Sequence, residues 1–464
     1  MFDHSALRSA AGGFVRSPLF IVILTGVILR LVLFPLTEGS YDAEHWATVI
    51  KNIESGNGLY ELEGYWYTPV WGYLLSFVSL VQDAFLNIDV LGMRVPEALV
   101  VESYGGNWIV SATVTSVAFN CAVKSLFLIS DLLVGYILYK IIKEKTGDPK
   151  KATMGFALWF ICPLVICSTS AQGMFDTFSV LFTLLCITFI RKDRLFLGGM
   201  MFTFAVLTKF FPAYLIFILA VYILIKHRDD GKGIRSLMIA GAGALLAFVV
   251  IMFPQILDGT LSESFLFLSS RTSIGGSTLF ETLVPQITIL FFTACVAVAV
   301  LLAYKMYKSR DCDPDDALFK YALMTIALLF LYPPLPQYLI LLMPFLAIYI
   351  ATKKRELWKG WFVLSVGATV FAVLGNLLFL LSFSTFTGIV SLDRLISLIE
   401  GFHSTTLFGV EIMTVLFYVL GALQYIGIMA VIWMIFKQPV SEFISRKKSG
   451  THADDASLDD VAAR

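Results

Sequence analysis

The chain has little charge and no excess of either sign. Only 15% of its 464 residues are charged, with 34 basic residues balancing 34 acidic ones, whereas a soluble domain averages about 25% charged residues. This balance leaves no basic surface for a nucleic-acid partner, and we therefore exclude one. Hydrophobic residues make up 58% of the chain. This composition predicts an all-α polytopic membrane protein.

Cysteine is also scarce, and no internal repeat or long soluble domain is visible. The six cysteines form no Cys-x-x-Cys pair, and five of them fall inside apolar runs. We interpret them as small buried residues that form neither a metal site nor a disulfide framework. No small-residue cleavage site follows the first apolar run, so we expect a retained helix there and not a signal peptide.

The apolar runs are long enough for twelve transmembrane helices. Their approximate limits are 19–36, 114–139, 152–170, 173–190, 195–209, 211–226, 236–257, 283–304, 320–334, 336–352, 360–383 and 408–436. This pattern divides the chain into a cytoplasmic N-terminus (1–18), a transmembrane domain (19–436) and a polar cytoplasmic tail (437–464). The tail is small and polar, and we expect it to be disordered.

The basic residues test this count, because cytoplasmic loops of membrane proteins carry an excess of Lys and Arg. With the N-terminus in the cytoplasm, the basic clusters all fall in inside loops, at 140–151, 191–194, 226–235, 305–310 and 353–355. The outside keeps five basic residues, Lys51, Arg94, Lys209, Arg271 and Arg394. We therefore expect both termini in the cytoplasm.

The first extracytoplasmic loop, 37–113, is long, acidic and aromatic. Residues 69–84 within it are too short to cross a bilayer, which takes about 20 residues. A crossing there would also reverse the sidedness of every later loop. We therefore expect an amphipathic helix lying on the outer surface.

Ionisable residues at the outer ends of the spans are the candidate site residues. Asp42 and Glu44 follow the first span, and Asp176, Lys209 and Arg271 lie on the same predicted face. An unpaired charge at membrane depth is costly unless it is functional. The alternatives are a solvated Asp42–Glu44 pair near a helix N-terminus, helix capping by Asp176, snorkelling of Lys209 and solvation of Arg271.

Two further charges, Lys124 and Asp131, fall within the second expected span. They lie two helical turns apart, on the same side of a helix. We expect them to pair with each other in a structural role.

Carboxylates beside cations at an outer membrane face suit the transfer of a group from a lipid-linked phosphate. A carboxylate can take the proton from an acceptor hydroxyl. Lys and Arg, or a metal held by the carboxylates, can stabilise the departing phosphate. The rival class is a secondary transporter or lipid flippase, for which twelve spans are common, but such proteins tend to show repeats and charges near the midplane.

Several short motifs occur in an order that resembles the GT-C superfamily of polytopic glycosyltransferases. Within it, the chain is most similar to the PIG-M family, mannosyltransferases that add the first mannose of GPI anchors, and to their prokaryotic relatives. The stretches that carry the resemblance are "YDAEHW", "YTPVWGYLL", "KSLFLISDLL", "SAQGMFDTF", "LTKFFPAY", "LSSRTS" and "LPQYLILL". Glu44 departs from the family pattern, which has Asp-x-Asp.

The resemblance implies a GT-C bundle and an inverting reaction with a polyprenyl-phosphate sugar donor, most simply dolichyl-phosphate mannose. It implies that Asp42 is the general base and that Glu44 assists it, with a divalent metal such as Mn or Mg held by the pair. The residues expected to bind substrate are Asp176, Lys209, Arg271, Tyr67 and Gln337.

The sequence is compatible with more than one substrate and more than one membrane. Another GT-C enzyme, using a different lipid-linked sugar or a protein acceptor, would carry the same motifs. The sequence also does not identify the membrane in which the protein lies, since the site would face the exterior in a prokaryote and the endoplasmic reticulum lumen in a eukaryote. The acceptor would be lipid-linked or a glycan.

Overall fold

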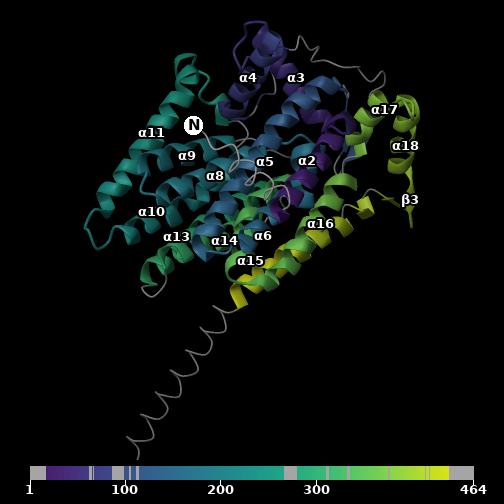
Figure 1. Cartoon of the computed structure of the whole chain (residues 1–464). Coiled ribbons are helices and arrows are strands. Elements are labelled where there is room, and N and C mark those ends of the chain that lie inside the picture. The colour runs from purple at the N-terminus through teal and green to yellow at the C-terminus, as the bar shows by residue number, and fades with distance from the viewer. Residues whose placement is uncertain are drawn as a thin grey trace, which may run out of the picture.

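The computed structural model describes residues 17–61, 65, 67–85, 99–103, 106–110, 114–265, 279–309, 313–331, 335–374, 377–412, 414–416 and 418–437. These residues are almost entirely helical (Figure 1). The short strands form two antiparallel hairpins, one of β1 (Leu99–Ser103) with β2 (Gly106–Val110) and one of β3 (Thr406–Leu407) with β4 (Val410–Glu411). The prediction of an all-α polytopic membrane protein is confirmed.

Every expected span contains helix. Six of the expected spans contain a long helix: α2 (Pro18–Leu36), α5 (Val117–Thr146), α11 (Gly233–Leu257), α13 (Leu279–Lys308), α16 (Trp358–Leu374) and the last helix, Thr414–Lys437. Shorter helices fill the others: α8 (Asp176–Arg191), α9 (Leu195–Thr208), α10 (Ile216–Lys226), α14 (Pro314–Leu329) and α15 (Met343–Thr352). In the described part of the chain, six helices are long and apolar enough to cross a membrane.

A seventh candidate span is broken. The helices α6 (Pro149–Phe160), α7 (Pro163–Ile166) and the π-helix η1 (Cys167–Ala171) fill the expected span 152–170, with a bend of 43° between α6 and the Pro163–Ala171 segment. Pro163 lacks the backbone N–H that would continue the α6 ladder, which explains the break. The expected span 360–383 is likewise divided, because η6 (Leu377–Leu380) and α17 (Leu381–Thr387) follow α16.

Small residues bring α9 and α11 close together. A Cβ at Gly199 of α9 would overlap the carbonyl oxygen of Ala240, and a Cβ at Gly243 of α11 would overlap that of Phe196. Glycine at such a crossing lets two helix backbones approach, which favours association in a membrane. This packing holds α9, and the residue that follows it, in a fixed place.

The basic loops that we expect in the cytoplasm meet at the start of α14. Arg191 at the end of α8 pairs with Asp315 at 2.5 Å, while Lys145 of α5 and Lys353 beyond α15 both pair with Asp316. These ends therefore lie on one side of the bundle, as the charge distribution requires. Their position in the cytoplasm stays a prediction.

The first loop carries α3 (Ser40–Glu54) and α4 (Pro69–Phe85), which Figure 1 shows at one end of the bundle. The expected helix over 69–84 is thus confirmed as a helix. It packs on α3, α9 and α11, and the Tyr73 hydroxyl donates to the carbonyl oxygen of Ile251 at 2.9 Å. The termini 1–16 and 438–464 lie outside the described residues.

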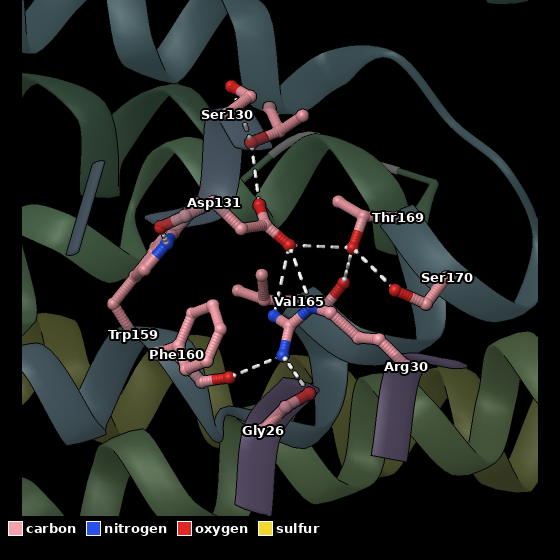
Figure 2. Close-up of polar contacts among 10 residues, drawn as sticks. Gly26, Arg30, Ser130, Asp131, Trp159, Phe160, Val165, Thr169 and Ser170 are labelled. Carbon is pink, nitrogen blue, oxygen red and sulfur yellow. Dashed lines mark hydrogen bonds and ion pairs between the residues drawn. The ribbon is translucent and has the colours of Figure 1, made fainter. Parts of the chain in front are cut away.

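The expected Lys124–Asp131 pair is wrong. Asp131 instead binds Arg30 of α2, whose Nη2 lies 2.9 Å from Oδ2 (Figure 2). The carboxylate also accepts from the Thr169 hydroxyl at 2.9 Å and from Thr177 at 2.7 Å. Both Arg30 and Asp131 are fully buried, and a buried charge must be paired. The first span supplies a longer, planar cation, so Lys124 bonds elsewhere.

Candidate active site

Three of the predicted site residues meet at one end of the bundle, although they are far apart in sequence. Asp176 opens α8, and Lys209 directly follows α9 in an extended conformation. Lys209 Nζ lies 3.5 Å from Asp176 Oδ1, and both side chains are almost completely buried. Asp42, in the first turn of α3, is close enough to interact electrostatically with both. The structure thus brings two carboxylates and a cation within electrostatic range of one another.

Aromatic rings surround the Lys209 ammonium. Its Nζ lies 4.4 Å from the ring centroid of Phe175, 5.1 Å from that of Tyr67 and 5.2 Å from that of Tyr338. A cation held over aromatic faces is stabilised by their quadrupoles, most of all when water is excluded. Lys209 is therefore held inside the site and does not snorkel.

The wall behind these rings comes from α3 and α4. Trp71 of α4 stacks on Phe175, with centroids 4.9 Å apart and planes 4° apart. Trp46 of α3 meets both rings edge-on, at 5.4 Å and 5.6 Å. Such aromatic pairs add about 0.5–1.5 kcal/mol each beyond their buried area. This packing fixes the helix that bears Asp42 against the start of the helix that bears Asp176.

The Asp42 carboxyl has the properties of a base that works near neutral pH. Burial raises its pKa to about 6, the Lys209 charge lowers it, and the Asp176 charge raises it. A general base is most effective when its pKa lies close to the working pH. Asp42 is therefore mostly ionised at pH 7 yet retains a useful affinity for a proton.

Asp176 has a free binding position. Its Oδ1 faces Lys209, but its Oδ2 is buried and has no hydrogen-bond partner among the described residues. Buried polar atoms in folded proteins almost always have a partner. The side chain also lies in the first turn of α8, where the helix dipole favours a negative charge. Oδ2 is thus suited to accept a hydrogen bond from a substrate hydroxyl.

The remaining predicted residues are placed differently. Glu44 lies two positions after Asp42 in α3, and side chains at that spacing do not face each other. Gln337 lies on η4 (Pro336–Leu341), beside Tyr338. Arg271 lies outside the described residues. The sequence reasoning missed Phe175 and Tyr338, although each is the immediate neighbour of a residue that it selected.

The helical spacing of Asp42 and Glu44 does not favour their binding the same metal ion. The two carboxylates point away from each other on the helix. Within the part of the chain that the structure describes, no three or more His, Cys, Asp or Glu side chains are grouped as metal ligands. A dependence of activity on Mn or Mg stays a prediction.

Part of the chain is similar to a known sequence family. Residues 103–257 match the family described as dolichyl-phosphate-mannose-protein mannosyltransferase (PMT_2), a stretch that contains Asp131, Asp176 and Lys209. Among solved structures, the chain is similar to ArnT from Cupriavidus metallidurans in the apo state. That similarity has 13% identity and a TM-score of 0.46, and it covers 91% of this chain and 77% of the other. Neither comparison tests the resemblance to the PIG-M family.

Proposed function

We propose that the chain is a GT-C-type glycosyltransferase. It transfers a hexose, most simply mannose, from a polyprenyl-phosphate sugar to a lipid-linked or glycan acceptor at the extracytoplasmic membrane face. The observation that carries the proposal is the meeting of Asp42, Asp176 and Lys209 from three separate segments in one buried, aromatic-walled site. The family match over residues 103–257 supports it, since that family is described by a dolichyl-phosphate-mannose donor.

In this mechanism Asp42 takes the proton from the acceptor hydroxyl. The acceptor oxygen then attacks the anomeric carbon from the face opposite the phosphate, and the bond from that carbon to the phosphate oxygen breaks. The electron pair of that bond leaves with the polyprenyl phosphate. Because the acceptor attacks the opposite face, the configuration at the anomeric carbon is inverted. Lys209 stabilises the negative charge that develops on the leaving oxygen, because a fixed cation in a water-poor site acts strongly on developing charge.

The other side chains orient the donor. Asp176 Oδ2 accepts a hydrogen bond from a sugar hydroxyl, and the Tyr67 and Tyr338 rings provide stacking faces. Burial raises the pKa of the Tyr67 phenol above its usual range, so it keeps its proton and can donate. Gln337, Arg271 and Glu44 remain proposed contributors. A donor lipid cannot leave the bilayer, which accounts for a base at the end of the first span.

One observation favours a secondary transporter as the second candidate. Transporters use broken helices beside buried charges, and the bent α6–α7–η1 segment lies beside Arg30 and Asp131. However, Arg30, Thr169 and Thr177 together satisfy both carboxylate oxygens of Asp131. A fully satisfied network of this kind stabilises a fold without needing a transported ligand.

The experiment uses membranes from cells that express the chain. Radiolabelled polyprenyl-phosphate mannose is supplied, with and without EDTA, and label is followed into a lipid or glycan product. We expect transfer by the wild type; an effect of EDTA would reveal a metal. If the chain transfers none of the four sugars mannose, glucose, galactose and arabinose from their polyprenyl-phosphate donors, the transferase proposal fails. Uptake or flipping assays then become the appropriate test.

A further inference from the structure

Lys124 has no place in the reaction, yet it is buried beside the site. It lies within α5 and is 1% exposed. Its Nζ donates to three backbone carbonyl oxygens: those of Phe34 at 3.3 Å and Ala171 at 3.4 Å, and that of Thr37. Phe34 and Thr37 end the first span, while Ala171 ends the π-helix η1. One ammonium group therefore joins the ends of two helices from distant parts of the chain.

The same two segments touch at Gly39. A Cβ at this position would overlap the carbonyl oxygen of Gln172, the residue after η1. The backbone of Gly39 has negative φ (−82°), so another residue would fit its conformation and only space is lacking. Asp42 follows Gly39 by three residues, and Asp176 follows Gln172 by four. The contact thus lies immediately before both carboxylates.

Glu38 holds the residues that follow α2 through contacts with other parts of the chain. Its Oε2 accepts from the Thr115 hydroxyl at 2.7 Å and from the Asn120 side chain at 3.1 Å, and its backbone N–H donates to Phe379 at 2.9 Å. Glu38 is fully buried and attracts the Lys124 charge. Carbonyls at helix ends have no partner within the helix and readily bind cations.

We propose that Lys124 is a positioning residue, which together with the close packing at Gly39 holds the end of α2 against the end of η1. This contact sets the separation between Asp42 on one side and the Asp176–Lys209 pair on the other. The inference rests on the proposed function for its kinetic consequence alone. A base displaced by about 1 Å can lower a rate on the order of 100-fold.

The test compares two variants that disturb the contact from opposite sides. Lys124→Met removes the three donated hydrogen bonds, and Gly39→Ala adds a methyl group where Gln172 leaves no room. Gly241→Ala is the matched control, because a Cβ at that helical glycine would meet nothing within 4 Å. Backbone hydrogen–deuterium exchange of the full-length protein in detergent reports the local order without any substrate.

We expect faster exchange over 37–44 and 171–177 in both variants, with exchange over 318–329 unchanged. In a transfer assay, kcat falls on the order of 100-fold while the KM for the donor changes little, since Lys209 and Asp176 still bind it. If Lys124→Met does not fold, Gly39→Ala alone decides.

Unchanged exchange in the two segments, or a rise in only one of them, overturns the coupling. Faster exchange in both segments, combined with a wild type that transfers no sugar, supports the positioning and refutes the proposed function. Equal falls in kcat for Gly39→Ala and Gly241→Ala would show that the glycine contact has no special role, which also overturns the proposal.

Discussion

The pH dependence of transfer should report the ionisation of Asp42. If its pKa is about 6, the ionised fraction is about 9% at pH 5, half at pH 6 and about 91% at pH 7. The acidic limb of kcat/KM should therefore rise about tenfold from pH 5 to pH 7. An ordinary aspartate would have ionised well below this range, at a pKa of about 3.9.

The sign of the Lys209 effect provides a second check on the same limb. The Lys209 charge lowers the pKa of Asp42, so Lys209→Met should shift the acidic limb to higher pH while also lowering the maximum rate. The assay is initial-rate label transfer from the polyprenyl-phosphate donor at several pH values and constant ionic strength. A limb near pH 4, or one that stays in place in Lys209→Met, would refute this account of the base.

The remaining predictions concern stability and packing. Because the pKa of Asp42 is raised in the folded protein, the folded protein holds this proton to higher pH than the unfolded chain, and stability is lost as pH rises from about 4 to 6. Asp42→Asn removes this loss, so it should raise the melting temperature more at pH 8 than at pH 4. The corresponding gain in unfolding free energy is at most about 3 kcal/mol. Asp131→Asn leaves the buried Arg30 without its counter-ion and should lower the free energy of unfolding by about 3–5 kcal/mol, measured by thermal unfolding. A change below about 1 kcal/mol would show that the pair is dispensable. Phe175→Ala removes the ring between Trp71 and the Lys209 ammonium, and should cost about 3–5 kcal/mol in the same assay; retention of full stability would contradict the packing described.

The sequence predicted the helices well because apolar runs and basic loops are local signals. Each expected span contains helix, and the basic ends of α5, α8 and α15 do gather at the start of α14. The break at Pro163 was missed, because a proline inside an apolar run can either kink a span or end a helix.

Pairing between helices could not be predicted in the same way. The expected partner of Asp131 was Lys124, two turns away on the same helix, but tertiary packing brings Arg30 to it from α2. Among the candidate site residues, Asp42, Asp176 and Lys209 could be selected from the sequence because a charge at membrane depth is unusual. Phe175 and Tyr338 gave no such signal, since aromatic residues are common throughout this chain.

The most direct test of the central claim is label transfer by the purified chain, comparing Asp42→Asn with Glu61→Gln. Both variants remove one carboxylate from the segment 37–113, but Glu61 is exposed and lies outside the candidate site. Asn keeps the shape of Asp42 and cannot take the acceptor proton. The account predicts transfer by the wild type and by Glu61→Gln, with loss of at least about 100-fold in Asp42→Asn. Equal transfer by all three proteins would contradict it.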